Sequence, residues 1–156
     1  MDHVLQGSPA TKRILLVTGV GDCANATEEA FRTASETGAE IGLLQILTSD
    51  LYHYGHNDLI ATRPSKKDFL LYIREQVLER GRAEAEALQR RAHAMGLAVE
   101  VYSVETEDAP SVIIAEARKG YDAIFIPRER KALFPLFKKQ LASRLRRHLR
   151  NLVVEC

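Results

Sequence analysis

The sequence predicts an α/β fold, in which a single three-layer, doubly wound domain places helices on both faces of a five-stranded parallel sheet. Short apolar runs such as residues 14–18 and 41–47 do not alternate with polar residues, which indicates strands that are covered on both faces. Helical patterns separate the successive runs, so the elements follow the order βαβαβαβαβ. A chain of 156 residues is long enough for one such domain with its own core.

Each element follows from a local pattern. Residues 1–11 show no periodicity and are expected to form a loose tail, which leaves a domain at residues 12–156. The predicted strands are residues 14–18, 41–47, 97–104, 122–126 and 152–154. The predicted helices are residues 24–37, 65–95 and 108–119, and a last one from residue 140 onward. The run at 14–18 should lie at the centre of the sheet, whereas residues 97–104 alternate more and are placed toward an edge.

The helix ends carry their own signals. Gly38 is expected to cap the first helix in the left-handed conformation, and Asp108 to cap the start of the third, with Pro110 in its first turn. Residues 48–64 form the longest irregular segment, and loops of this length are often functional, although the sequence does not indicate its role. The long helix that follows should be anchored on the sheet by apolar side chains, namely Phe69, Ile73, Val77 and Leu88.

Composition narrows the class of protein. No apolar run approaches the roughly 20 residues that span a bilayer, and the N-terminus lacks the apolar core of a signal peptide, so a cytoplasmic protein is expected. Cys23 and Cys156 lie far apart and form no CxxC pair, which argues against a disulfide framework or a structural zinc site.

Residues 128–150 are strongly basic. Nine Lys or Arg residues and a single acid, Glu129, give this segment a net charge of +8, so the rest of the chain carries −7. Such a split suggests an anionic partner or an acidic surface that faces the segment. An apolar stripe expected to face the core is formed by Leu141, Leu145 and Leu149. The candidate anion or partner surface consists of Lys138, Lys139, Arg144 and Arg147.

This basic surface has two interpretations. It is either a solvated helix face whose cations favour the C-terminal end of the helix, or a site for an anionic small molecule, an acidic protein, an acidic lipid or nucleic acid. Nucleic acid is not favoured, because no aromatic residues are interleaved with the basic ones. His53 and His56 lack a helix to hold them around a metal, and no catalytic constellation is evident, so neither a metal nor an enzyme activity is expected.

The second half of the chain resembles a known family. Residues 105–117, ETEDAPSVIIAEA, and residues 120–126, GYDAIFI, are similar to the second half of a universal stress protein domain of the UspA-like type. The resemblance extends over nearly the whole chain and implies an adenine nucleotide α-hydrolase-like fold and a role in stress response or regulation. It also implies a homodimer formed by pairing of the last strands, which would place at the interface Leu152, Val153 and Val154.

One motif of that family is missing. ATP-binding members carry Gly, two residues, Gly, nine residues, Gly, then Ser or Thr after the fourth strand. The matching positions here are Pro127, Arg130, Gln140 and Leu141. Glycines at these positions let backbone amides approach phosphate oxygens, and larger side chains fill that space. The family's nucleotide binders also keep an Asp after the first strand, where Gly19 stands here. We therefore expect no cofactor, with ATP and AMP both disfavoured.

An alternative ligand site is still suggested by the ends of the strands. A turn containing Gly19 and Gly21 before a helix could hold a phosphate, although a plain tight turn is the preferred interpretation. Arginines after the fourth strand could supply charge without a close backbone approach. The candidate ligand-binding residues are Thr18, Gly19, Gly21, Asp22, Pro127, Arg128 and Arg130.

Together these patterns predict a homodimeric, non-catalytic stress-response or regulatory protein that does not hold ATP in the family's usual manner. The first alternative is a nucleotide- or phosphate-binding module that uses Arg128, Arg130 and the turn from Gly19 to Asp22. The second, less favoured, is an interaction domain that is recruited to membrane or nucleic acid by its basic helix.

Overall fold

The computed structural model describes most of the domain. The described residues are 12–20, 23–47, 63–127, 144, 145, 147, 149 and 153–155. The predicted tail at residues 1–11 lies outside this range, as does the irregular segment at residues 48–62.

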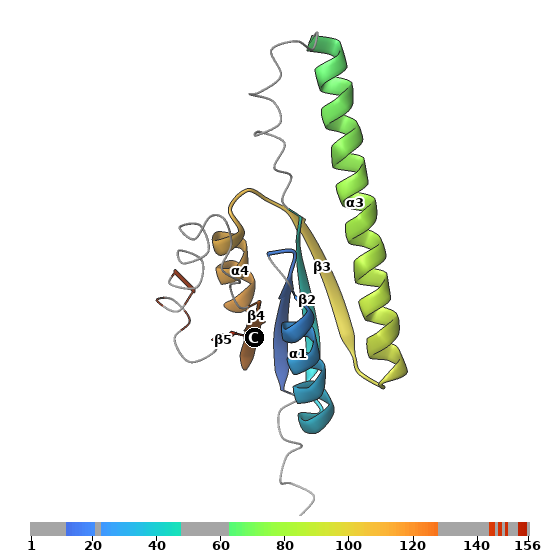
Figure 1. The fold of residues 1–156 in the computed structure, drawn as a ribbon. Coiled ribbons are helices and arrows are strands. Elements are labelled where there is room, and N and C mark those ends of the chain that lie inside the picture. Colours follow the sequence, from blue (N-terminus) through green and yellow to red (C-terminus); the bar gives the residue numbers. More distant parts are fainter. Residues whose placement is uncertain are drawn as a thin grey trace, which may run out of the picture.

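Five parallel strands form one sheet in the order β3-β2-β1-β4-β5 (Figure 1). Their bounds are β1 Arg13–Thr18, β2 Glu40–Leu47, β3 Val99–Glu105, β4 Ala123–Ile126 and β5 Val153–Glu155. β1 lies at the centre, between β2 and β4, and β3 lies at an edge. The predicted fold class and the predicted positions of these strands are therefore confirmed.

Helices cover both faces of the sheet. The helices are α1 Ala24–Thr37, α3 Arg63–Ala94 and α4 Ala109–Ala117. Ile14 and Leu16 of β1 pack in one cluster with α1 and the C-terminal part of α3, whereas Leu15 and Val17 pack with α4 in a second cluster. Because each face of β1 has its own apolar cover, the strand shows no alternation in sequence.

The predicted helix ends are confirmed. Gly38 has a φ of 72°, and its backbone N–H donates to Ala34 O at 2.8 Å. The carboxylate of Asp108 accepts from the backbone N–H of Ser111 at 3.3 Å, which caps α4, and Pro110 lies in the first turn of that helix. These contacts satisfy polar groups that the helices leave without intrahelical partners.

The anchoring predicted for the long helix is only partly correct. α3 begins at Arg63, two residues before the predicted start at residue 65, and Phe69 is 52% exposed instead of being an anchor. Ile73, Val77 and Leu88 are half-buried. The buried positions on α3 belong to small residues, namely Gly81, Ala85 and Ala92. A helix of 32 residues is about 48 Å long, so its N-terminal half extends past the sheet (Figure 1).

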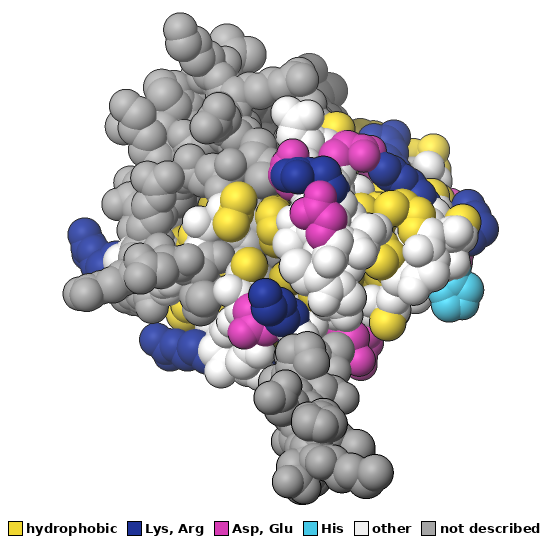
Figure 2. All heavy atoms as spheres, turned by 90° about the horizontal axis from the view of Figure 1, so that it is seen from below, with side chains coloured by type: hydrophobic (Ala, Val, Ile, Leu, Met, Phe, Trp, Pro, Cys, Tyr) yellow, Lys and Arg dark blue, Asp and Glu magenta, His cyan; other side chains and the backbone are white. Residues whose placement is uncertain are grey.

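The amino ends of the strands form a mixed surface. Seen from this end, basic and acidic side chains are intermingled with hydrophobic ones on the described part of the face (Figure 2). Among the described residues, no helix is long and apolar enough to cross a membrane.

Candidate functional site

The carboxyl ends of β1 and β4 lie side by side where the strand order reverses. The register that places Leu16 opposite Phe125 brings Pro127 level with Thr18. Ligands of open α/β sheets bind beyond such a point, so Thr18 and Pro127 lie where a site is expected. Pro127 is buried directly after β4.

A hollow of ≈ 530 Å³ opens at this end of the sheet, on the side of α1 and α3. Its walls come from the ends of β1 and β2, the first turns of α1 and the C-terminal half of α3. The lining includes Thr18, Gly19, Thr27, Glu28, Gln45 and Arg91. The volume is within the range of small-molecule sites.

Thr18 is the unusual residue of this hollow. It is 7% exposed, and its Oγ1 is buried without a hydrogen-bond partner among the described residues. Like Ile14 and Leu16, it points to the α1 side of the sheet, because side chains alternate along a strand. A buried hydroxyl left unpaired costs about 1–3 kcal/mol. Thr18 Oγ1 is thus placed to exchange a hydrogen bond with a molecule in the hollow.

Gln45 forms the fixed floor of the hollow. Its side chain is 3% exposed, its Nε2 donates to Gly81 O at 2.6 Å, and its Oε1 accepts from Ser103 Oγ at 2.9 Å. A Cβ on Gly81 would lie 2.6 Å from Leu47 Cδ2, so the glycine lets α3 approach the sheet closely. This amide joins α3, β2 and β3 and holds the wall in place.

The backbone around residue 19 requires a glycine at this position. Its φ is 91°, and a Cβ at this position would lie 1.9 Å from Ile46 O. No side chain fits there without movement of β2. The preferred interpretation of this glycine, a tight turn that needs positive φ, agrees with this geometry. The same contact explains why a carboxylate could not simply replace Gly19.

Charged side chains line the rim. Arg91 Nη2 donates to Glu28 Oε1 at 2.5 Å, and its guanidinium lies 5.1 Å from the centre of the Phe31 ring. This ion pair joins α3 to α1 across the hollow. Because both side chains are well exposed, the ion pair contributes little to stability. Its main effect is to place one positive and one negative group at the rim of the hollow.

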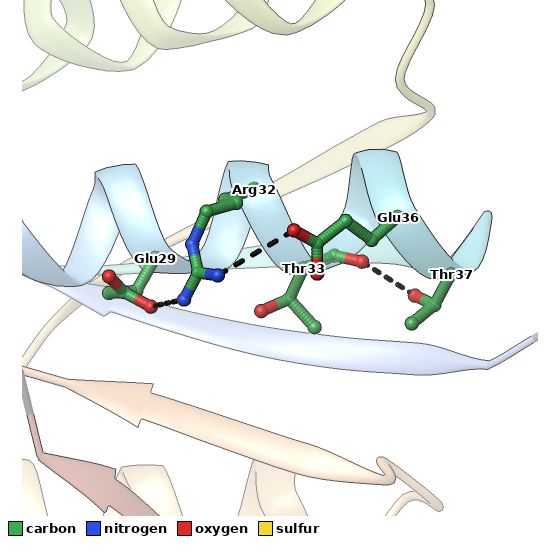
Figure 3. Close-up of polar contacts among 5 residues, drawn as sticks. All are labelled: Glu29, Arg32, Thr33, Glu36 and Thr37. Carbon is green, nitrogen blue, oxygen red and sulfur yellow. Dashed lines mark hydrogen bonds and ion pairs between the residues drawn. The ribbon is translucent and has the colours of Figure 1, made fainter.

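The outer side of α1 is also rich in ion pairs. Arg32 bridges Glu29 and Glu36, and the hydroxyl of Thr37 donates to Thr33 O at 2.7 Å (Figure 3). These contacts lie on the helix surface and not in the hollow. Cys23 occupies the N-cap position of α1, lines the hollow and is half-buried.

A model of the universal stress protein family matches residues 10–153. The chain belongs to the universal stress protein family. The resemblance noted in the second half of the sequence is thereby confirmed, and it extends over most of the chain. A search of curated protein sequences finds no match.

Solved structures of this family share the fold. A universal stress protein family member from Burkholderia pseudomallei superposes with a TM-score of 0.66 at 20% identity, over 96% of this chain and 98% of that chain. A family protein from Arabidopsis thaliana with AMP bound gives 0.59 at 17% identity, over 92% and 90%. A universal stress protein in complex with cAMP gives 0.53 at 13% identity, over 92% and 94%.

Several predicted residues of this universal stress protein fall outside the described range. They are Gly21, Asp22, Arg128, Arg130, Lys138, Lys139 and Leu152. His53 and His56 are outside it as well, and the described residues contain no group of acidic, His or Cys side chains that could hold a metal.

Two arginines of the basic segment are described. Arg147 is exposed, and Arg144 Nη1 lies 3.8 Å from Asp108 Oδ1, the capping carboxylate of α4. Leu145 and Leu149 are buried against α4, so the predicted stripe is confirmed at these two positions. Arg144 has an acidic neighbour within the fold, which agrees with the interpretation of an acidic surface that faces the segment.

The charged form of the Asp108 side chain is stabilised by its contacts at this helix cap. Hydrogen bonds from the Ser111 hydroxyl and amide, with a further contribution from Arg144, hold the pKa of Asp108 below its usual range. A lowered pKa means that the folded state prefers the charged form. The stabilisation is thus present above the unfolded pKa and is lost as the pH falls through the folded pKa.

We expect Asp108→Asn to be less stable than the wild type at neutral pH, because asparagine keeps a capping oxygen but not the charge. The difference should shrink as the pH falls below about 4, where the carboxyl becomes protonated first in the unfolded chain and, at still lower pH, in the folded wild type. Thermal unfolding of both proteins at pH 7 and at pH 3 measures this. An equal difference at both values would show that the charge of Asp108 is irrelevant.

Sequence reasoning missed the hollow because its walls come from distant segments. Gln45, Glu28 and Arg91 were not among the predicted site residues. Only Gln45 gave a signal, since it is the one polar side chain within the apolar run of β2 from Ile41 to Leu47.

Proposed function

We propose that this protein is a non-catalytic regulatory member of the universal stress protein family that responds to a small ligand held in the hollow between α1 and α3. The observation that carries the proposal is the buried hydroxyl of Thr18, which faces a hollow of ≈ 530 Å³ at the carboxyl end of the sheet. Proteins rarely leave a buried polar group unpaired unless a ligand or water satisfies it.

The ligand is not ATP bound in the family's usual manner. The signature glycines are replaced by Pro127, Arg130 and Gln140, and Gly19 leaves no room for a side chain where the family's nucleotide binders have Asp. Binding in the hollow would instead use Thr18 on the sheet and the paired charges of Glu28 and Arg91 at the rim.

Mass spectrometry of the small molecules released by denaturing the purified protein tests this proposal. We expect a bound compound other than ATP, or a rise in melting temperature with one member of a library of small polar metabolites. Stoichiometric ATP in the released fraction would contradict the exclusion of ATP. If no compound is released and none of the library shifts the melting temperature, the hollow is not a ligand site.

We predict that Thr18→Val raises the stability of the ligand-free protein and abolishes ligand binding. Valine has nearly the same shape as threonine, and removing an unpaired buried hydroxyl should stabilise the fold by about 1 kcal/mol. Urea unfolding of the ligand-free protein measures the first effect, and the amount of co-purified compound measures the second. Thr27→Val, the same replacement on the α1 wall, is the control and should give no such gain.

A second candidate function is nucleotide binding through the arginines after β4. It is favoured by two relatives of similar fold, one described with AMP bound and one in complex with cAMP. Arg128 and Arg130 would supply the phosphate contacts in place of the missing glycines. Titration of AMP, cAMP and ATP by calorimetry into the wild type and into Arg128→Glu/Arg130→Glu distinguishes this function. Equal binding in both proteins would exclude the arginines as the phosphate site.

The proposed homodimer forms at the β5 edge of the sheet. β5 pairs with β4, placing Val153 opposite Ile124 and Val154 opposite Phe125, and it is the last strand at this edge. Val153 is half-buried, whereas Val154 is 38% exposed. A second copy that pairs along the same edge would extend the sheet across a two-fold axis.

We predict that Val154→Lys breaks this contact, because a charge would be buried at the centre of the paired strands. Sedimentation velocity should show the loss of the species that forms through β5. Ser35→Lys places the same charge on the exposed outer side of α1 and should leave the mass unchanged. A Val154→Lys protein with the wild-type mass would exclude the β5 edge.

A further inference from the structure

The N-terminal half of α3 exposes large apolar side chains beyond the carboxyl ends of the strands. Phe69, Leu71 and Tyr72 are 52%, 47% and 58% exposed. The other exposed large hydrophobic side chains among the described residues, Met95 and Val154, lie elsewhere. Figure 1 shows this half of α3 standing clear of β2 and β3. A patch of exposed apolar side chains is typical of an interaction surface.

Two of these three exposed side chains, Phe69 and Tyr72, lie on the same side of α3. Tyr72 and Ile73 lie three and four residues after Phe69, and Gln76 lies four and three residues after them, which places all four on one side of the helix. Arg80 and Ala83 continue the same side toward the C-terminus. We call these six residues the α3 stripe.

The α3 stripe is not an extension of the core. The side of α3 that faces the sheet is marked by Arg74, which binds Glu105 of β3 through two hydrogen bonds of 2.9 and 3.0 Å, and by Gly81 and Ala85, which are buried. These positions lie about a third of a turn away from Phe69 and Ile73, given 3.6 residues per turn. Folding of this domain therefore leaves five of the six stripe residues exposed among the described residues, and only Ile73 is half-buried.

The net charge along α3 changes sign between residues 74 and 75. Residues 63–74 contain four basic residues and one acid, a net charge of +3. Residues 75–86 contain two basic residues and four acids, a net charge of −2. An identical helix lying antiparallel would place each positive segment beside the negative segment of the other copy. A parallel arrangement would instead bring like charges together.

We propose that the α3 stripe is an interface with a second copy of the chain, in which the N-terminal halves of two α3 helices pack antiparallel about a two-fold axis. The axis passes between residues 74 and 75, so Phe69 lies beside the partner's Arg80, and Tyr72 and Ile73 lie beside the partner's Gln76. Guanidinium groups stack favourably on aromatic rings, and Ala83 leaves room for close approach of the backbones.

A second copy fits this surface for a geometric reason as well. The two helices extend past their own sheets in opposite directions in an antiparallel pair, so the two domains stand at opposite ends and do not compete for space. The contact is isologous, because both copies contribute the same surface to it. The assembly through this contact is therefore complete with two copies. Each copy thereby covers the aromatic side chains that the other leaves exposed.

This interface is separate from the proposed dimer at the β5 edge. α3 lies over β2 and β3, and β5 forms the opposite edge of the sheet, so both contacts can be occupied together. The wild type should then associate beyond a dimer as its concentration rises. The two contacts can be tested one at a time.

Sedimentation velocity at a series of protein concentrations tests the proposal. In a Val154→Lys background, which removes the β5 contact, we expect a monomer that associates to a dimer. Adding Phe69→Ser and Tyr72→Ser should weaken that association by about tenfold or more, because buried aromatic side chains dominate such interfaces. Leu71→Ser is the matched control, since Leu71 is similarly exposed but lies on another side of the helix.

The outcomes separate the alternatives. Loss of association with Phe69→Ser/Tyr72→Ser but not with Leu71→Ser supports the α3 stripe, as does weaker association at high salt, where the opposite charges are screened. A Val154→Lys protein that stays monomeric at every concentration would overturn the proposal and leave the stripe to a different partner. Equal weakening by the stripe variant and by Leu71→Ser would overturn it too. Circular dichroism establishes that each variant is folded.

Discussion

Gly19→Ala is expected to destabilise the fold by more than about 3 kcal/mol, the largest effect of a single methyl group at the site. Part of this cost, about 1–2 kcal/mol, comes from placing a side chain at a φ of 91°. The rest comes from the added Cβ, which would lie 1.9 Å from Ile46 O. Since Ile46 O belongs to the backbone of β2, the methyl group can be accommodated only if two central strands move apart.

Gly38→Ala separates the two costs. Gly38 also has a positive φ, 72°, but no atom lies within 4 Å of the position that a Cβ would take. Its replacement should therefore cost only the conformational part, about 1–2 kcal/mol. Urea unfolding of both variants measures the difference. Equal losses of stability would show that β1 and β2 can move apart at Ile46 at little cost, contrary to the geometry.

The same contact bears on nucleotide binding in this protein. Restoring the family's Asp with Gly19→Asp would add a carboxylate to a position that cannot accept even a methyl group. We therefore expect this variant to lose stability without gaining affinity for ATP. A carboxylate at residue 19 would require a different backbone path for the turn after β1, and not only an exchange of side chains.

The sequence predicted the fold well because its signals are local. Each face of β1 has its own apolar cover, so the uninterrupted run at residues 14–18 indicated a central strand. Asp108 and Gly38 use capping contacts that involve only neighbouring residues, and both were predicted correctly. Periods and caps of this kind require no knowledge of distant segments.

The course of α3 could not be predicted in the same way. Phe69 has the helical spacing of a core anchor, but whether it reaches the sheet depends on where the helix leaves the sheet. That point is set by Gly81 packing against Leu47 and by Arg74 binding Glu105. Both contacts join residues more than 30 positions apart in the chain, so the sequence pattern did not reveal that Phe69 lies beyond the carboxyl ends of the strands.

The hollow lies at the same end of the sheet as the candidate site predicted from the sequence, but its walls were not predicted. The rule that ligands bind beyond the carboxyl ends of the strands placed Thr18 there. Nothing in the sequence showed that its hydroxyl would be buried beside Gln45, nor that Arg91 would reach Glu28 across the hollow. These features depend on the packing of α1 and α3 against the sheet.

Gly42→Ala is the second large effect, at the opposite end of the sheet. A Cβ on Gly42 would lie 2.6 Å from the hydroxyl oxygen and 2.9 Å from Cε1 of Tyr121. Tyr121 is 4% exposed, and its hydroxyl donates to Glu116 Oε1 at 2.9 Å. Burial and the Glu116 carboxylate raise the pKa of Tyr121 above its usual range, so the hydroxyl remains a donor at neutral pH.

Displacing the Tyr121 ring would also leave the carboxylate of Glu116, which is 8% exposed, without this donor. We expect Gly42→Ala to cost about 2–3 kcal/mol, combining overpacking with the loss of a buried hydrogen bond. The salt bridge of 2.7 Å between Glu116 and Lys119 should survive, which limits the loss.

A double-mutant cycle identifies the cause. Tyr121→Leu alone should be destabilising, but in that background Gly42→Ala has no ring to displace and should cost little. The coupling free energy is therefore expected to be about 1–2 kcal/mol in favour of the double variant.

Tyr121→Phe removes only the hydroxyl, and since Cε1 still lies in the way, it should relieve the strain only in part. Additive losses in the cycle would mean that Gly42 acts through the backbone of β2 and not through Tyr121. Strong coupling would show that the packing of Tyr121 against Gly42 fixes the amino ends of the strands.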